Sequence, residues 1–137
     1  CISSDHAGYI LKEYVKNYLI KKNIFVIDLG PKSNNSVDYP DYAKKVAKRI
    51  KQRKSDAGIL ICGSGTGMAI SANKIKDIRA AVCYNLKSTQ LSRLHNNANV
   101  ICLGSRLTKK KDIKKIVIAF LKTKFEGGRH LRRVKKI

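Results

Sequence analysis

Short apolar runs alternate along the chain with longer segments in which apolar residues recur every three or four positions. Polar side chains hardly interrupt the runs, which is typical of strands that are buried on both faces. We therefore predict five short strands, at residues 1–4, 24–29, 57–62, 79–83 and 99–103. Because residue 1 already belongs to a predicted strand, we expect that the first residues of this strand are missing from the sequence.

The segments between the runs have the period of amphipathic helices. In the first of them, six apolar residues share one helical face and four lysines lie mostly opposite. The apolar residues are Ile10, Leu11, Tyr14, Val15, Tyr18 and Leu19, and the lysines are Lys12, Lys16, Lys21 and Lys22. A second helix is predicted from Pro40, whose fixed φ suits a helix start. Further helices are predicted at 66–75, 87–95 and 110–124.

Strands that alternate with helices favour a parallel sheet covered on both faces. With right-handed crossovers, the order predicts an α/β fold, a three-layer α/β/α sandwich with a Rossmann-like five-stranded parallel sheet. A length of 137 residues corresponds to a single domain. Residues 125–137 show no strong period and contain two glycines, so we predict an extended C-terminal arm. No apolar run approaches the roughly 20 residues that span a bilayer, so no membrane association is expected.

The net charge of +21 is unevenly distributed, with 12 basic and 6 acidic residues in 1–68 and 18 and 3 in 69–137. Such a balance attracts polyanions and steers anionic ligands. Nucleic-acid binding is one interpretation. Solvated helix faces are favoured instead, because the lysines lie mostly opposite the apolar stripes and no aromatic stacking platform is present. Four widely spaced cysteines without a C-x-x-C pair indicate reduced thiols in a cytoplasmic protein.

Cys62 ends a predicted buried strand and is followed directly by a glycine-rich turn, 63–67, that opens a helix. Backbone N–H groups and the positive end of the helix dipole favour a reactive thiolate there. The glycine spacing fits neither the dinucleotide motif nor a P-loop. Taken alone, the glycine-rich segment is equally typical of a plain structural turn. Cys62 taken alone is typical of a buried structural thiol. Their combination favours function, because a plain turn needs neither three glycines nor the hydroxyl of Ser64.

Other polar residues follow the ends of predicted strands and helices. In a parallel sheet, ligands bind beyond the carboxyl ends of the strands. Asp5 and His6 follow one predicted strand and Cys62 ends another, so we expect these residues to lie at the same edge of the sheet. Asp5 either caps the next helix or binds a sugar hydroxyl. His95 lies either in a polar helix-terminal turn or in a position for acid–base work. The arginines Arg106, Arg129, Arg132 and Arg133 are either solvated or placed for a phosphate group.

Taken together, several segments resemble the type B ribose-5-phosphate isomerases, a family shared with the bacterial galactose-6-phosphate isomerase subunits. The resemblance covers essentially the whole chain. The segments are SDHAG at 4–8, DYP at 38–40, ICGSGTG at 61–67, ANK at 72–74, RA at 79–80, HN at 95–96, LGSR at 103–106 and EGGRH at 126–130.

The resemblance implies reversible conversion of ribose 5-phosphate and ribulose 5-phosphate in the pentose phosphate pathway, with no metal or organic cofactor. It implies that Cys62 moves a proton between C1 and C2 through an enediolate while backbone N–H groups stabilise the oxyanion. The implied catalytic residues are Cys62, His95, Asp5 and Ser64. The implied substrate contacts are Asp5, His6, Tyr39, Gly63, Ser64, Gly65, Thr66, Gly67, Asn96, Arg106, Arg129 and Arg133.

Within that family, some relatives use a glutamate later in the loop as the base. Here Met68 follows the loop and Cys62 is present, so the chain is similar to the cysteine subgroup. The resemblance also implies a homodimer or homotetramer in which His95, Asn96 and the tail arginines reach a neighbouring subunit's site. The alternatives are a hexose-phosphate isomerase acting on galactose 6-phosphate or allose 6-phosphate, and a basic nucleic-acid-binding protein.

Overall fold

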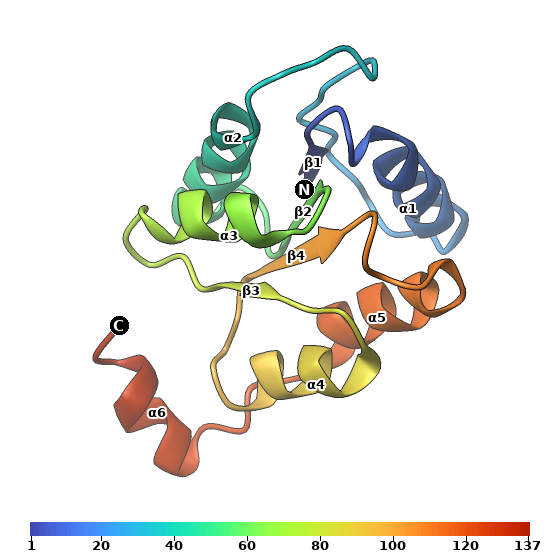
Figure 1. Cartoon of the computed structure of the whole chain (residues 1–137). Helices are drawn as coiled ribbons and strands as arrows, with labels where there is room; N and C mark the ends of the chain where they lie inside the picture. The colour runs from blue at the N-terminus through green and yellow to red at the C-terminus, as the bar shows by residue number, and fades with distance from the viewer.

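The computed structural model describes residues 1–137 as one parallel sheet surrounded by six helices (Figure 1). The strands are β1 (Ile2–Ser4), β2 (Gly58–Cys62), β3 (Ala80–Val82) and β4 (Val100–Gly104). The helices are α1 (Tyr9–Lys21), α2 (Tyr39–Lys51), α3 (Thr66–Asn73), α4 (Leu86–Leu94), α5 (Lys110–Lys122) and α6 (Gly128–Val134). The strand order is β1-β2-β4-β3 and every neighbouring pair is parallel. The predicted class, an α/β domain with a parallel sheet, is confirmed.

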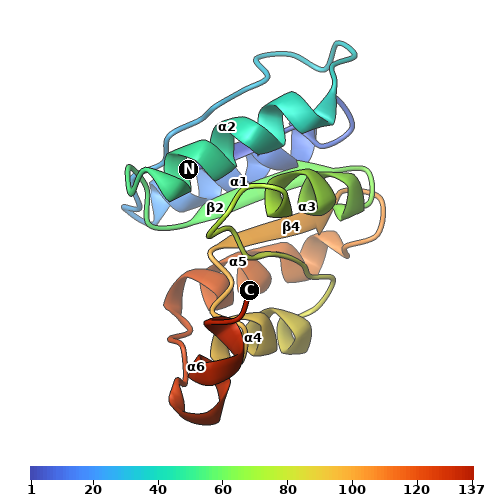
Figure 2. The ribbon, with the colours of Figure 1, turned by 90° about the vertical axis from the view of Figure 1, so that its left-hand side faces the viewer.

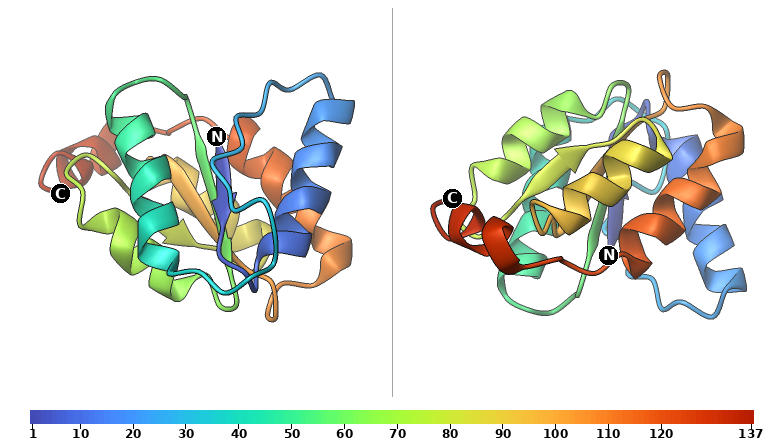
Figure 3. Two further views of the ribbon diagram at one scale, coloured as in Figure 1. Left: turned by 90° about the horizontal axis from the view of Figure 1, so that it is seen from above. Right: turned by 90° about the horizontal axis from the view of Figure 1, so that it is seen from below.

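Two apolar cores lie on opposite faces of the sheet, and Figure 3 shows the helices that cover these faces. Helices α1 and α5 cover one face, and α2 and α3 cover the other. Alternate residues of β2 divide between the cores, because successive side chains of a strand point to opposite faces. Ile59 and Ile61 join the first core, whereas Leu60 and Cys62 join the second. This alternation directs the Cys62 side chain toward the layer of α2 and α3.

The prediction of a fifth strand at 24–29 is wrong. This segment runs beside β1, where the Ile2 N–H donates to the Ile27 carbonyl and the Leu29 N–H donates to the Ile2 carbonyl, both at 2.9 Å. The pairing amounts to one isolated parallel bridge, between Ile2 and Asp28. Because β1 has only three residues, and the segment turns away at Gly30, no continuous ladder forms. The apolar pattern reflects packing against the edge of the sheet.

Two residues of α1 lie on the side opposite to the predicted one. Lys12, expected on the solvated face, is fully buried, and Ile10, expected in the core, is 76% exposed. The Lys12 ammonium donates to both carboxylate oxygens of Asp28, at 2.9 and 2.7 Å, and to the Pro31 carbonyl at 2.9 Å. A buried ammonium is tolerated because these acceptors replace its water.

The C-terminal arm is helical, not extended. Gly127 and Gly128 have positive φ angles of 71° and 48° and turn the chain into α6. This helix projects from the rest of the molecule, away from α1 and α2 (Figures 1 and 2). Only two turns long, it is too short for a helical period to stand out in the sequence. No helix in the structure combines the length and apolar character that a bilayer span requires.

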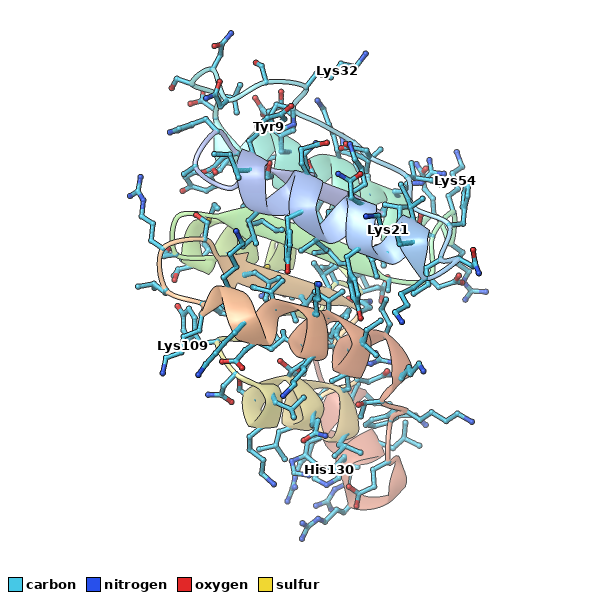
Figure 4. All side chains as sticks on the ribbon, turned by 90° about the vertical axis from the view of Figure 1, so that its right-hand side faces the viewer. Tyr9, Lys21, Lys32, Lys54, Lys109 and His130 are labelled. Carbon is cyan, nitrogen blue, oxygen red and sulfur yellow. The ribbon has the colours of Figure 1, made fainter.

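The positive charge is spread over the outer surface. Figure 4 shows Lys21, Lys32, Lys54 and Lys109 at widely separated places on one side of the molecule. All four are exposed. This distribution agrees with the interpretation of the lysines as solvated residues on the outer faces.

Candidate active site

A cavity of about 330 Å³ opens at the carboxyl edge of the sheet, where ligands bind in parallel α/β folds. Its wall combines a thiol, a carboxylate, a phenol, a guanidinium group and glycine backbone. The lining residues are Asp5, Tyr39, Cys62, Gly63, Ser64, Gly67, Arg106 and Leu107. Seven of these eight were predicted as site residues from the sequence, and Leu107 was not.

Cys62 reaches the cavity from the last position of β2. Its side chain is largely covered, with the residue 5% exposed, and its Sγ accepts a hydrogen bond from the Gly65 N–H at 3.0 Å. Gly65 has a φ of 85° and starts α3, so the chain turns sharply back over the sulfur. Only glycine adopts this conformation without strain. The local sequence therefore places a helix N-terminus directly against the thiol.

Three backbone N–H groups in the same wall, those of Gly63, Ser64 and Gly67, have no acceptor within the chain. Gly63 and Ser64 lie in the turn before α3, and Gly67 lies in the first turn of α3, where no preceding helical turn supplies carbonyls. Together with the helix dipole they make a place for negative charge. The cavity therefore combines a thiol with a set of amide donors suited to an oxyanion.

Asp5 lines the cavity from the position directly after β1, the strand that pairs with β2. It is 7% exposed, and its Oδ1 accepts from the Gly8 N–H at 2.8 Å. This bond holds the turn that precedes α1, and the predicted cap on an amide of the helix itself is not formed. Gly8 is packed so closely that a Cβ there would lie 2.2 Å from the Ile61 carbonyl oxygen. The Ser105 hydroxyl donates to the Ala7 carbonyl at 2.9 Å and ties this turn to the end of β4. The carboxylate is thus held rigidly beside the strand that carries the thiol.

The rim of the cavity is polar and more open. Tyr39, the first residue of α2, is 41% exposed and its ring lies against Gly67, where a Cβ would be 2.8 Å from the ring Cζ. The Arg106 guanidinium lies next to Gly63, with Nη1 3.4 Å from the position of a Cβ at that residue. Tyr84 donates from its hydroxyl to the Ser64 carbonyl at 3.2 Å. An anionic group at this rim would meet a guanidinium and a phenol.

The structure does not bring the remaining predicted residues into this cavity within one chain. His6 is exposed near the rim and its Nδ1 accepts from the Val37 N–H at 3.4 Å. Thr66 and Gly65 belong to the loop but do not line the cavity. His95, Asn96, Arg129 and Arg133 lie at the end of α4 and on α6, and none of them lines it.

Those distant residues form a cluster of their own. The rings of His95 and His130 are stacked, with centroids 4.2 Å apart and planes 7° from parallel. The Glu126 Oε2 lies 3.7 Å from His95 Nε2 and 4.0 Å from His130 Nε2. Partial burial and the neighbouring His95 lower the pKa of His130 from its ordinary value. Neither Glu126 nor His130 is predicted from the sequence to have a role of its own.

The other core cysteines differ from Cys62 in their surroundings. Burial raises the pKa of Cys102 well above its ordinary value, and burial likewise raises the pKa of Cys83 despite a hydrogen bond to Ser92. Both therefore stay protonated near neutral pH. All four cysteines are free, and of these only Cys62 lines the cavity. It is the one thiol placed for chemistry at this edge.

A parallel α/β sheet with an acid–base cavity at its carboxyl edge defines an enzyme that acts on a small molecule. The family model described as Ribose/Galactose Isomerase matches residues 1–137. The chain is 47% identical to the ribose-5-phosphate isomerase B of Escherichia coli, over 97% of this chain and 89% of that protein. It is also 47% identical to a putative sugar phosphate isomerase of Rickettsia bellii, over 99% and 94% of the two chains.

Solved structures show the same relationship. A ribose 5-phosphate isomerase from Thermotoga maritima is 52% identical, with a TM-score of 0.97 over 98% of this chain and 93% of that one. The ribose-5-phosphate isomerase B of Mycoplasma genitalium, solved with bound ribulose-5-phosphate, is 47% identical, with a TM-score of 0.94 over 98% and 90%. This chain belongs to the Ribose/Galactose Isomerase family and is a sugar-phosphate isomerase.

Proposed function

We propose that this chain interconverts D-ribose 5-phosphate and D-ribulose 5-phosphate. The observation that carries the proposal is the position of Cys62, which lines one cavity with three residues whose backbone N–H groups are unpaired and with the Asp5 carboxylate. Aldose–ketose conversion needs a base next to a group that stabilises negative charge on oxygen. The bound ribulose-5-phosphate in the Mycoplasma genitalium relative supports the choice of a pentose.

In the proposed reaction, the Cys62 thiolate removes the proton from C2 of the open-chain aldose. The electron pair of that C–H bond forms the C1–C2 double bond, and the carbonyl electrons move onto O1. The amides of Gly63, Ser64 and Gly67 hydrogen-bond the resulting enediolate. A hydroxyl proton passes from O2 to O1, by way of the Ser64 hydroxyl in the same wall, and the thiol returns its proton to C1. The ketose results without any change in total protons or electrons.

Ring opening and phosphate binding are assigned to residues from two chains. Asp5, His6 and Arg106 lie at or near the cavity of their own chain. His95, Asn96 and the arginines of α6 do not line it. We propose that they complete the cavity of a second copy, with His95 exchanging the ring-opening proton and Arg129 and Arg133 binding the phosphate. The projection of α6 from the body of the molecule supports this arrangement (Figure 2).

The proposal is tested by mixing two inactive variants, Cys62→Ala and His95→Asn. Each variant alone should lose about 10³-fold in turnover of ribose 5-phosphate, since each lacks one acid–base group. If a site is shared between two chains, a mixed dimer contains one intact site. An equimolar mixture, refolded or exchanged together, should then recover about a quarter of the wild-type turnover.

The matched control is Cys83→Ser, which removes a buried thiol outside the cavity and should keep turnover near the wild-type level. Near-normal turnover of Cys62→Ala would refute the role of the thiol. Inactive variants whose mixture stays inactive would refute the shared site alone. Six-carbon sugar phosphates, assayed beside ribose 5-phosphate, test the hexose alternative. Four free cysteines are consistent with a reducing compartment, and we place the enzyme in the cytoplasm.

A further inference from the structure

The cluster of His95, Glu126 and His130 has the composition of a metal site. We propose that it binds one divalent transition-metal ion of the class of Zn²⁺ or Co²⁺, and that the bound ion inhibits the isomerase. One ligand atom from each residue can be chosen so that all three lie within 4.8 Å of one another. The cluster lies where α6 meets the end of α4, and none of its residues lines the cavity of Cys62 in the same chain.

The donor set suits such an ion. Two imidazoles and one carboxylate are ligands that zinc and neighbouring metals accept, at about 2.0–2.2 Å from the ion. In a tetrahedral site, ligand atoms at that radius are about 3.4 Å apart. The Glu126 Oε2 is 3.7 Å from His95 Nε2 and 4.0 Å from His130 Nε2. The two imidazole planes are stacked and nearly parallel, so one ring must turn out of the stack for both nitrogen lone pairs to point at a shared ion.

The backbone holds the three residues together before any ion binds. The Glu126 N–H donates to the Leu94 carbonyl at 3.1 Å, which holds the backbone of Glu126 next to the end of α4, where His95 lies. The glycine turn then reverses the chain, and the His130 N–H donates to the Gly127 carbonyl at 2.9 Å. His130 is 6% exposed although it lies on a projecting helix. This arrangement lowers the entropic cost of assembling the ligands.

Glu126 lies in a strongly basic segment, yet it pairs with two histidines and with none of the nearby arginines. It is the only acidic residue after Asp112, and the same segment carries Arg129, Arg132 and Arg133. Its carboxylate forms no ion pair with any of these arginines and lies instead next to the two imidazoles. The carboxylate would therefore supply the one anionic donor of the proposed site.

Two features oppose binding and limit its strength. The arginines of α6 repel a cation, and the Arg129 Nε lies 3.5 Å from His130 Nε2 as a hydrogen-bond donor. An ion at that nitrogen must displace the guanidinium. We therefore expect modest affinity, suited to an ion that inhibits when abundant and not to one held permanently.

We expect inhibition because a bound ion would block two groups that the proposed reaction uses. This part of the inference rests on the proposed function. An ion on His95 Nε2 occupies the lone pair that would exchange the ring-opening proton. Displacement of Arg129 would also remove one of the proposed phosphate contacts. The ion would act against ring-closed substrate and would supply no step of the reaction.

The test of binding is a Co²⁺ titration of the whole chelator-treated protein, followed by visible d–d absorption. Wild-type protein should saturate at one ion per chain. Glu126→Gln and His130→Asn should each weaken binding about tenfold or more, because each removes a ligand. The matched control is His6→Asn, which removes the third histidine of the chain and should leave the titration unchanged. Titrations of Glu126→Gln and His130→Asn that match the wild type, or a thiolate-to-cobalt charge-transfer band that disappears in Cys62→Ser, would overturn the site.

The test of inhibition compares turnover of ribose 5-phosphate with and without Zn²⁺ within each variant. Wild-type turnover should fall as Zn²⁺ rises, and Glu126→Gln should need about tenfold more Zn²⁺ for the same fractional loss. Equal sensitivity of the two proteins would overturn the inhibitory role. If the metal-free wild type has no isomerase activity, the proposed function fails, whereas the spectroscopic titration still decides the metal site.

Discussion

The buried ammonium of Lys12 allows a sharp prediction about stability. Lys12 is fully buried, and the Asp28 carboxylate that pairs with it comes from the segment beside β1. Replacing Asp28 by asparagine keeps the size of the side chain and removes its charge. The ammonium would then lie in the interior without its main counter-charge. We expect Asp28→Asn to cost more than removal of the lysine charge itself.

The magnitude follows from what each change leaves unpaired. Removing one partner of a fully buried ion pair costs about 3–5 kcal/mol. In Asp28→Asn the ammonium keeps the Glu13 carboxylate and the Pro31 carbonyl, both at 2.9 Å, so we expect about 2 kcal/mol. In Lys12→Met the Asp28 side chain is 26% exposed and keeps Lys16, so we expect about 1 kcal/mol.

The pH dependence of this difference has a definite sign. Burial raises the pKa of the Asp28 carboxyl, but hydrogen bonds from Lys12, Lys16 and the Gly30 N–H outweigh it and hold the pKa below the ordinary value of 3.8. A lowered folded-state pKa stabilises the protein fully above that ordinary value, and the contribution is lost as pH falls through the folded pKa. The difference between wild type and Asp28→Asn should therefore be constant from about pH 7 to pH 5 and shrink below about pH 4.

The assay is urea unfolding followed by far-ultraviolet circular dichroism, at one fixed protein concentration because the proposed oligomer would make stability depend on concentration. The control is Lys16→Met, whose side chain is 22% exposed and should cost about 0.5 kcal/mol. A larger cost for Lys12→Met than for Asp28→Asn would refute the reasoning. So would a difference that grows as the pH falls.

Two further predictions concern the site. Gly8→Ala places a Cβ 2.2 Å from the Ile61 carbonyl and should destabilise the fold by more than about 3 kcal/mol. Gly67→Ala displaces only the exposed Tyr39 ring and should raise KM with a stability loss under about 1 kcal/mol; equal stability losses measured by urea unfolding would contradict the contrast. His95→Asn should slow ring-closed ribose 5-phosphate far more than a substrate supplied in the open-chain form, and stopped-flow assays showing equal losses would remove His95 from ring opening.

Much of the fold could be predicted because local pattern and backbone chemistry agree along most of the chain. The apolar run before Cys62 is β2, and the glycine turn after it opens α3 as predicted. The helices expected at 66–75, 87–95 and 110–124 correspond to α3, α4 and α5 within a few residues. Asp5 and Cys62 could be placed at one edge because parallel strands share a carboxyl end.

Partners distant in sequence decided what these patterns could not. An apolar run predicts burial but not a hydrogen-bonded neighbour, so residues 24–29 became a packed edge segment beside a three-residue strand. The helical period predicted that Lys12 lies on the solvent-exposed face of α1. Tertiary packing instead brings the Asp28 carboxylate next to the Lys12 ammonium, and this ion pair stabilises the lysine in the interior.

The sequence alone therefore determined the alternation of elements, the thiol at a strand end and the glycine turn over it, because those depend on neighbours a few residues away. The tertiary structure decided which amides remain unpaired in the cavity, which lysine is buried, and that Glu126 faces two histidines on α4 and α6. These features depend on atoms from separate segments, and their positions follow only from the packing of the whole chain.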